Sequence, residues 1–165
     1  MPFHFLKKRS CMKILFAEDN PDIREFYCSL FFETIPGIQI IEVDNGKNGI
    51  AELLKRNNSF DLVITDYFMP NGHGDLICNY LYKTGSNIPF IYLTARPYEE
   101  IMTKTSFFPM RKGLDYYLKK SGNVSNFHYK MHDICLNIIT YYKEKNLSGP
   151  DGFQQISEYF LQTIK

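Results

Sequence analysis

Short apolar runs alternate along the chain with longer stretches in which apolar residues recur every three or four positions. The short runs are rich in β-branched and aromatic residues and cover residues 14–17, 38–43, 60–65, 88–94 and 116–118. Runs of this length and composition are typical of buried strands in a parallel sheet that is covered on both faces. The pattern therefore predicts five buried strands.

The intervening stretches have the spacing of amphipathic helices. Pro21 is favourable in the first turn of one helix, and Pro36 and Gly37 end that helix. Further helices are predicted over residues 47–57, 75–83 and 98–105, the last of which has the weakest pattern. The clearest apolar stripe has a 4-3-4-3 spacing and consists of Phe127, Met131, Ile134, Ile138 and Tyr141.

Strand and helix alternate five times, which is typical of an α/β domain with a parallel sheet and right-handed crossovers. We predict this domain over residues 12–145, with an N-terminal extension at residues 1–11. Residues 146–165 are predicted to be a linker and a short amphipathic C-terminal helix. The apolar positions of that helix are Phe153, Ile156, Phe160 and Ile164.

Composition narrows the classes of partner. The net charge of the 165 residues is +1, which gives no electrostatic reason to expect nucleic acid or a membrane surface as the main partner. No apolar run approaches the ~18–20 residues of a membrane span. The four cysteines are widely spaced and form no C-x-x-C pair, which indicates reduced thiols in apolar segments. We therefore expect a cytoplasmic protein that binds neither nucleic acid nor membranes.

Polar residues stand at the ends of the predicted strands. Glu18 and Asp19 follow the first strand, Asp66 the third and Lys120 the fifth, while Thr94 ends the fourth. Ligands of such sheets bind beyond the carboxyl ends of the strands, so these side chains are expected at one edge. Crowded carboxylates attract a hard divalent cation such as Mg²⁺, and a lysine supplies a point charge for a phosphoryl oxygen. Together they suit transfer of a phosphoryl group to a carboxylate.

Four segments resemble the motifs of response-regulator receiver domains, the CheY-like family of two-component signalling. Residues 62–70 (LVITDYFMP), with Gly74 following, are similar to the phosphoacceptor motif. Residues 14–20 (ILFAEDN) resemble the acidic-pair strand, residues 91–95 (IYLTA) the threonine strand and residues 113–120 (GLDYYLKK) the lysine strand. The likeness extends from residue 12 to about residue 145. It implies a flavodoxin-like, doubly wound, five-stranded parallel sheet in the order 2-1-3-4-5, with helices on both faces.

The resemblance implies that Asp66 is the nucleophile and phosphorylation site. It also implies that Glu18, Asp19 and Asp66 hold Mg²⁺ together with the backbone carbonyl of Phe68. The implied activity is self-phosphorylation and autodephosphorylation, and the protein is otherwise not an enzyme. The implied phosphoryl donor is a sensor histidine kinase or a phosphotransfer protein. The downstream target is not indicated, and homodimer formation is left open.

The resemblance further implies that Lys120 pairs with the phosphoryl group. Thr94 would reach toward a phosphoryl oxygen, and Tyr117 would rotate inward to fill the space that Thr94 leaves. The spacing of the family motif selects Lys120 over Lys119. Phosphorylation would thus favour one packing of the loops that follow the third and fourth strands.

The chain departs from the family pattern in two places. Ser121 stands where the family usually has a proline after its lysine, often across a cis peptide bond. Because a cis bond before a non-proline residue costs about 2.5–4 kcal/mol, we expect either strain or a trans bond with shifted lysine geometry. The stretch between Thr94 and Tyr117 is also longer than usual, which predicts an unusual partner surface. Phe68 and Arg96 occupy positions that tune loss of the phosphoryl group in the family, and an apolar ring at Phe68 predicts slow autodephosphorylation.

Alternative interpretations remain open at this point. The chain could be a pseudo-receiver, an unphosphorylated adaptor with the same fold. Asp19 or Asn20 could cap the helix that begins at Pro21. A phosphoester hydrolase is disfavoured because such enzymes place a second acid two residues after the nucleophile, where this chain has Phe68.

Two weaker motifs carry less weight. The pair Gly72 and Gly74 only faintly resembles a dinucleotide-binding loop, because Ile77 occupies the third glycine position. His128 and His132, four residues apart, could share one face of a helix and bind a metal, but no third ligand is evident.

Overall fold

The computed structural model describes residues 11–55, 57, 59–104 and 110–153. Five parallel strands form one sheet in the order β2-β1-β3-β4-β5, which confirms the predicted fold class. The strands are β1 (Met12–Ala17), β2 (Ile38–Val43), β3 (Leu62–Thr65), β4 (Phe90–Thr94) and β5 (Asp115–Lys119). The helices are α1 (Pro21–Thr34), α2 (Gly46–Lys55), α3 (Asp75–Lys83), α4 (Tyr98–Lys104) and α5 (Val124–Glu144).

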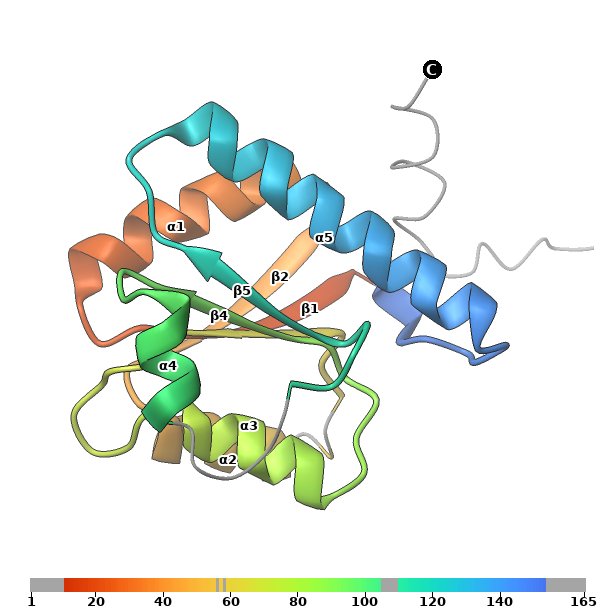
Figure 1. The fold of residues 1–165 in the computed structure, drawn as a ribbon, viewed down its shortest axis with the longest axis horizontal. Coiled ribbons are helices and arrows are strands. Elements are labelled where there is room, and N and C mark those ends of the chain that lie inside the picture. The colour runs from red at the N-terminus through yellow and green to blue at the C-terminus, as the bar shows by residue number, and fades with distance from the viewer. Residues whose placement is uncertain (1–10, 56, 58, 105–109, 154–165) are drawn as a thin grey trace, which may run out of the picture.

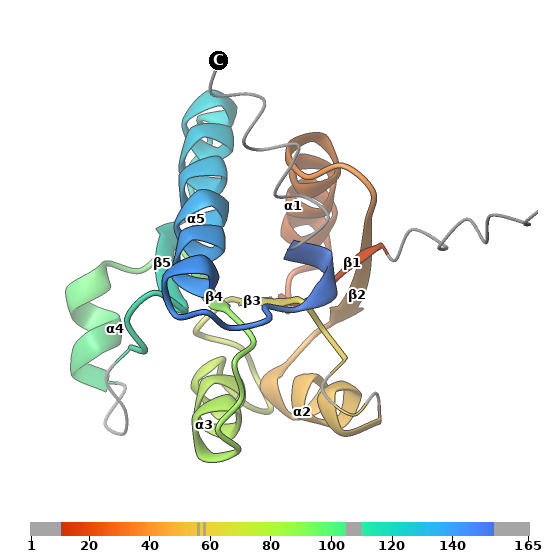
Figure 2. The ribbon, with the colours of Figure 1, turned by 90° about the vertical axis from the view of Figure 1, so that its right-hand side faces the viewer.

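The helices cover both faces of the sheet. Figure 2 shows α1 and α5 side by side on one face, and α2 and α3 on the other. The order of strands reverses between β1 and β3, because β2 lies outside β1 and the later strands follow on the other side (Figure 1). In doubly wound sheets this reversal point opens a crevice at the carboxyl ends of the strands. The fold therefore directs the ends of β1 and β3 into the predicted site.

Two apolar cores lie on opposite faces of the central strands. Alternate residues of one strand belong to different cores: Phe16 packs with α1 and α5, whereas Leu15 packs with the residues of α2 and α3. Every residue of β3 and β4 is buried, as expected of central strands in a parallel sheet. This double burial explains why these strands have continuous rather than alternating apolar sequences.

Two strands begin later than the apolar runs suggest. The fourth run starts at Ile88, but β4 begins at Phe90, because Pro89 has no N–H to donate to a neighbouring strand. The third run starts at Phe60, but β3 begins at Leu62. Asp61, between Phe60 and Leu62, is buried and binds main-chain groups outside the sheet ladder.

The Asp61 carboxylate joins the two ends of the described chain. One oxygen accepts a hydrogen bond from the Lys13 N–H at 2.6 Å, and the other accepts one from the Gly152 N–H at 2.8 Å. A Cβ atom at Gly152 would lie 2.6 Å from this carboxylate, so a larger residue would not fit there. The neighbouring Phe153 is buried against Tyr142 of α5. The segment after α5 therefore returns to the edge where β1 begins.

Arg111 holds the turn that precedes β5. Its guanidinium group pairs with the Asp115 carboxylate at 2.6 Å, and this carboxylate also accepts the Arg111 N–H at 2.7 Å. The same guanidinium donates to the carbonyl oxygens of Ser86 and Ile88. This cluster ties the start of β5 to the segment before β4.

Some predictions fall on residues that the structure does not describe. The extension at residues 1–11 lies outside them except for Cys11, and the C-terminal helix lies outside them beyond Phe153. The unusual partner surface was predicted for the stretch between Thr94 and Tyr117, of which residues 105–109 also lie outside. The division into residues 1–11, 12–145 and 146–165 thus stays a prediction. Among the described helices, none is long and apolar enough to cross a membrane.

The cysteine prediction is correct in part. Cys28 and Cys135 are buried and Cys78 is partly buried, but Cys11 is exposed. All four thiols are free.

Candidate functional site

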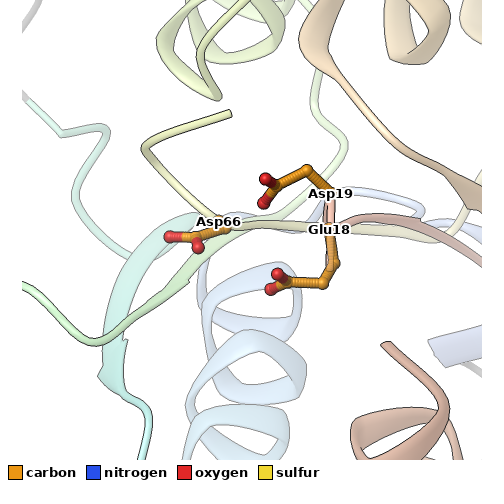
Figure 3. A group of neighbouring side chains, drawn as sticks. All are labelled: Glu18, Asp19 and Asp66. Atoms are coloured by element: carbon orange, nitrogen blue, oxygen red, sulfur yellow. The ribbon is translucent and has the colours of Figure 1, made fainter. Parts of the chain in front are cut away.

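Three carboxyl groups meet at the carboxyl edge of the sheet. Glu18 and Asp19 follow β1, and Asp66 follows the adjacent strand β3. The Asp66 N–H donates to the Ala17 carbonyl at 2.9 Å, which extends the pairing of β3 with β1 by one hydrogen bond. One carboxylate oxygen from each residue lies within 4.8 Å of the others. Figure 3 shows the three side chains pointing in the same direction. This confirms that the sheet brings the three predicted acids together.

Lys120 lies between two of these acids. Its Nζ atom donates to Glu18 Oε2 at 2.5 Å and to Asp66 Oδ2 at 2.7 Å. The side chains of Lys120 and Asp66 are only 11% and 13% exposed, and that of Glu18 is 1% exposed. The pairing is therefore largely shielded from water. Charge interactions are stronger in such a protected place than in water. Lys119, the competing residue, is exposed.

The charges of this group shift its protonation equilibria. Burial raises the pKa of Glu18, and the nearby charge of Asp66 acts in the same direction, while the hydrogen bond and charge of Lys120 oppose both. Burial alone would lower the pKa of Lys120, but its hydrogen bonds to Asp66 and Glu18 outweigh burial and raise it. Lys120 therefore remains a cation at neutral pH and compensates the buried carboxylates.

The main chain around Asp66 fixes the direction of its carboxylate. The Tyr67 N–H donates to Asp66 Oδ1 at 2.6 Å, so one oxygen is held by the main chain and the other by Lys120. A few residues on, the Gly74 N–H donates to the Tyr67 carbonyl at 2.9 Å. A Cβ atom at Gly74 would clash with the Asp66 carbonyl oxygen, so this close turn requires glycine. The glycine in the phosphoacceptor motif thus has a steric cause.

The capping role at the start of α1 belongs to Asn20. Its side-chain oxygen accepts hydrogen bonds from the N–H groups of Asp22 and Ile23 at 3.0 and 3.1 Å. Asp19 is exposed and takes no part in this cap, which leaves its carboxylate in the acidic group. Arg24, one turn into α1, donates to the Glu18 carbonyl at 2.5 Å and so ties the acidic loop to the helix.

The predicted switch residues meet at the main chain of Arg96. The Thr94 hydroxyl, which is buried, accepts a hydrogen bond from the Arg96 N–H at 3.3 Å. The Tyr117 hydroxyl donates to the Arg96 carbonyl, and its ring lies edge-on to Tyr98 of α4 at 5.5 Å. The Thr94 carbonyl also accepts the Lys120 N–H at 2.8 Å. In this structure Tyr117 thus contacts α4 and the loop before it.

The Phe68 ring contacts Arg96. The guanidinium carbon of Arg96 is 5.1 Å from the centre of this ring, which is the geometry of a cation–π interaction. Tyr67 packs edge-on to the same ring at 4.7 Å. Two neighbours thus hold the Phe68 ring in place, and its effect on the loss of a phosphoryl group stays a prediction. The role of the Phe68 carbonyl as a metal ligand stays a prediction.

Tyr27 was not singled out from the sequence, but it contacts the turn that follows Lys120. Its hydroxyl accepts a hydrogen bond from the Ser121 N–H at 3.1 Å. The Lys120–Ser121 peptide bond is trans, which is one of the two outcomes expected for the serine in place of proline. Tyr27 lies three residues after Arg24 on α1, so the two share the helix side nearest the site. In the sequence, only the three-residue spacing between Arg24 and Tyr27 could have indicated that Tyr27 lies near the site.

The weaker metal hypothesis is not supported. Among the described residues, the ligand atoms of Glu18, Asp19 and Asp66 form the group that could hold a metal ion. His128 instead contacts the Thr34 hydroxyl at 3.0 Å and lies 3.5 Å from the Glu33 carboxylate.

The fold and the site together define a doubly wound α/β domain with an acidic group and a lysine at its carboxyl edge. A model of the response regulator receiver domain family matches residues 14–132, and the chain belongs to this family. Receiver domains are signalling domains of two-component systems rather than conventional enzymes. The family match confirms the resemblance found in the four motifs.

Relatives and solved structures agree with this assignment. The response regulator SaeR of Staphylococcus aureus is 26% identical over 131 residues, which are 79% of this chain and 54% of SaeR. The chain thus spans about half the length of the curated relatives it matches. The response regulator TrrA of Thermotoga maritima, solved in complex with Mg²⁺ and BeF, is 27% identical with a TM-score of 0.59, over 74% of this chain and 97% of TrrA.

Two further structures extend the comparison. TrrA has also been solved in complex with the histidine kinase ThkA, and there it matches this chain at 27% identity with a TM-score of 0.57, over 74% of this chain and 97% of TrrA. The phosphorylated cyanobacterial phytochrome response regulator RcpA shares the fold at 18% identity and a TM-score of 0.58, over 86% of this chain and 99% of RcpA.

Proposed function

We propose that this chain is a phosphoacceptor switch that takes a phosphoryl group on Asp66 and changes its output surface in response. The observation that carries the proposal is the position of Lys120 Nζ, bonded at once to Asp66 and Glu18. A buried lysine between two acids supplies the positive charge that a phosphoryl group on one of them requires. The acidic group and the family membership support the same function.

In the proposed reaction an oxygen of the Asp66 carboxylate attacks the phosphorus atom of a phosphohistidine. A P–O bond forms, the P–N bond of the donor breaks, and its electron pair stays on the imidazole nitrogen. The Tyr67 N–H orients the carboxylate through Oδ1, so little reorganisation is needed before attack. Lys120 then exchanges carboxylate contacts for contacts with the phosphoryl oxygens.

The acidic group fits a bound Mg²⁺ ion. Glu18, Asp19 and Asp66 offer carboxylate oxygens within 4.8 Å of one another, and Mg²⁺ prefers such hard oxygen ligands. We propose these three residues and the Phe68 carbonyl as its ligands. When bound, Mg²⁺ supplies the positive charge that neutralises phosphoryl oxygens. Its binding also relieves the repulsion between carboxylates that Lys120 alone compensates here.

The switch is proposed to act through Arg96. Thr94 and Tyr117 both bind the main chain of this one residue, so neither can turn toward the site without releasing it. A phosphoryl group on Asp66 would attract the Thr94 hydroxyl, and Tyr117 would move into the space that Thr94 leaves. The two hydroxyl groups are therefore expected to change partners together, with repacking of Tyr117 against α4.

The proposed phosphoryl donor is a sensor histidine kinase or a phosphotransfer protein, and the proposed location is the cytoplasm. The complex of TrrA with the kinase ThkA supports the choice of donor. The switch implies a partner protein that binds the phosphorylated state. That partner could be a second copy of this chain, which would give a homodimer.

Intact mass after incubation with Mg²⁺ and acetyl phosphate tests the proposal. Wild type is expected to gain one phosphoryl group, and Asp66→Asn is expected to gain none. Omitting Mg²⁺ serves as a second control and is expected to suppress the gain. If wild type gains no mass and also fails to bind beryllofluoride, the chain is a pseudo-receiver whose partners read the unmodified fold.

A further inference from the structure

We propose that Tyr27 is a positioning residue for Lys120 and acts through the N–H of Ser121. The inference rests on the proposed function, because it concerns the lysine that is to hold the phosphoryl group. Tyr27 belongs to α1, whereas Lys120 and Ser121 follow β5, so the contact joins elements that are distant in sequence.

Hydrogen bonds hold the main chain of Lys120 on both sides. Its own N–H donates to the Thr94 carbonyl at 2.8 Å, which continues the pairing of β5 with β4. The next N–H, that of Ser121, donates to the Tyr27 hydroxyl at 3.1 Å. The peptide unit from which the lysine side chain departs is therefore fixed by β4 at one end and by Tyr27 at the other.

Tyr27 is a rigid anchor for this purpose. Only 3% of the residue is exposed, and its ring packs against Phe127 of α5 at 5.4 Å and Phe31 of α1 at 6.4 Å. Phe26 packs edge-on to it at 5.1 Å. A ring held on several sides has little freedom, so its hydroxyl oxygen has a fixed position. The core between α1 and α5 thereby determines where the turn after β5 lies.

The hydroxyl also lies within the electrostatic influence of the site. Burial raises the pKa of Tyr27, and the charges of Glu18 and Asp66 act in the same direction, whereas the Ser121 N–H and Lys120 oppose it. The group therefore stays a neutral hydroxyl that can accept the Ser121 N–H. A proline at position 121 would have no N–H to donate, so this anchor is available because residue 121 is not a proline.

A lysine needs such an anchor more than a shorter side chain does. Its ammonium group is carried by a flexible four-carbon chain, so any shift of the backbone displaces Nζ. The side chain then has many rotamers in which Nζ does not make its contacts. Nζ is bonded here to Glu18 at 2.5 Å and to Asp66 at 2.7 Å, and both bonds depend on the position of the Lys120 backbone. Loss of the Tyr27 hydroxyl would loosen the turn and leave the Ser121 N–H without its acceptor.

Tyr27→Phe removes the hydroxyl and keeps the ring. Its matched control is Tyr142→Phe, because Tyr142 is also buried and its hydroxyl donates to the Asn87 carbonyl at 2.5 Å, in the loop before β4. The rate of phosphorylation by acetyl phosphate with saturating Mg²⁺ is expected to fall about threefold to tenfold in Tyr27→Phe, the factor that one net hydrogen bond gives. Tyr142→Phe is expected to match wild type.

A double-mutant cycle separates positioning from a general loss of structure. In a Lys120→Gln background there is no ammonium group left to position, so adding Tyr27→Phe is expected to change the phosphorylation rate less than twofold. An undiminished effect in that background overturns the inference, as does a Tyr27→Phe rate equal to that of wild type.

Amide exchange provides a readout that does not depend on phosphorylation. The Ser121 amide is expected to exchange at least about tenfold faster in Tyr27→Phe than in wild type or Tyr142→Phe. Unchanged exchange at Ser121 overturns the inference even if the rate falls. If wild type takes no phosphoryl group, the proposed function fails by itself, and Ser121 exchange still decides whether Tyr27 holds the turn.

Discussion

Replacing Lys120 by methionine is expected to destabilise the fold strongly when Mg²⁺ is absent and weakly when it is present. Methionine keeps an unbranched side chain of similar length but removes the positive charge. The buried carboxylate of Glu18 and the largely buried one of Asp66 would then face each other without compensation. Mg²⁺ can take over this compensation because the same carboxylates are its proposed ligands.

The magnitude follows from the geometry. Nζ is bonded to carboxylate oxygens at 2.5 and 2.7 Å, and one such pair contributes about 6 kcal/mol at an effective dielectric constant of ~20, before the cost of desolvation. Protonation of Glu18 limits the damage, because burial and Asp66 already raise its pKa and loss of Lys120 would raise it further. We expect a net loss of about 3–5 kcal/mol in the free energy of unfolding, the range for breaking a buried pair.

Urea unfolding, followed by far-ultraviolet circular dichroism, measures this loss. Lys119→Met is the matched control, because Lys119 is exposed and its substitution removes the same charge. Mg²⁺ at about a hundred times its dissociation constant is expected to restore about 2.7 kcal/mol to Lys120→Met. A loss below about 1 kcal/mol without Mg²⁺ would refute the reasoning, as would a loss that Mg²⁺ does not reduce.

Three further outcomes are expected. Gly74→Ala should lower the free energy of unfolding by about 1–3 kcal/mol, because its Cβ would clash with the Asp66 carbonyl; equal urea midpoints would contradict this. Phe68→Ala should shorten the lifetime of phosphorylated Asp66 about threefold to tenfold, because water gains access; wild-type phosphoprotein that decays within seconds would rule out the shielding role. Burial raises the pKa of Asp61 above its ordinary value, so the folded state binds this proton more tightly than the unfolded chain does. The free energy of unfolding of wild type, minus that of Asp61→Asn, should therefore rise as the pH falls from neutral toward 4. A decrease of this difference in urea titrations over the same pH range would contradict the prediction.

Much of the fold and of the acidic site could be predicted because both depend on local patterns. Continuous runs of mostly apolar residues identified β3 and β4, since strands buried on both faces have no exposed position. Once the strands were placed, the parallel order put Glu18, Asp19 and Asp66 at the same edge. The family motif then selected Lys120 over its exposed neighbour Lys119.

The contacts that could not be predicted are long-range hydrogen bonds made by single side chains. The apolar run at residues 60–65 placed Asp61 inside a predicted strand. Its carboxylate instead binds the main-chain N–H groups of Lys13 and Gly152. The Tyr27 hydroxyl meets Ser121, which is 94 positions away in the chain. Neither contact leaves a periodic signal, because each depends on where two separately folded elements happen to meet. Ser121 drew attention only as a departure from the family pattern.

The Asp61 junction has a consequence for how the chain can be rearranged or extended. One carboxylate holds both Lys13 and Gly152, so a short connection between these two points would close the polypeptide into a ring without moving β1. A new opening at the exposed turn around Gly85 would then give a circular permutant with the same sheet. Both attachment points are bonded to Asp61, and the start of β1 lies at the edge of the sheet away from the carboxyl ends of the strands (Figure 1). A dye, a surface tether or a fused domain joined there would leave the approach to Asp66 open.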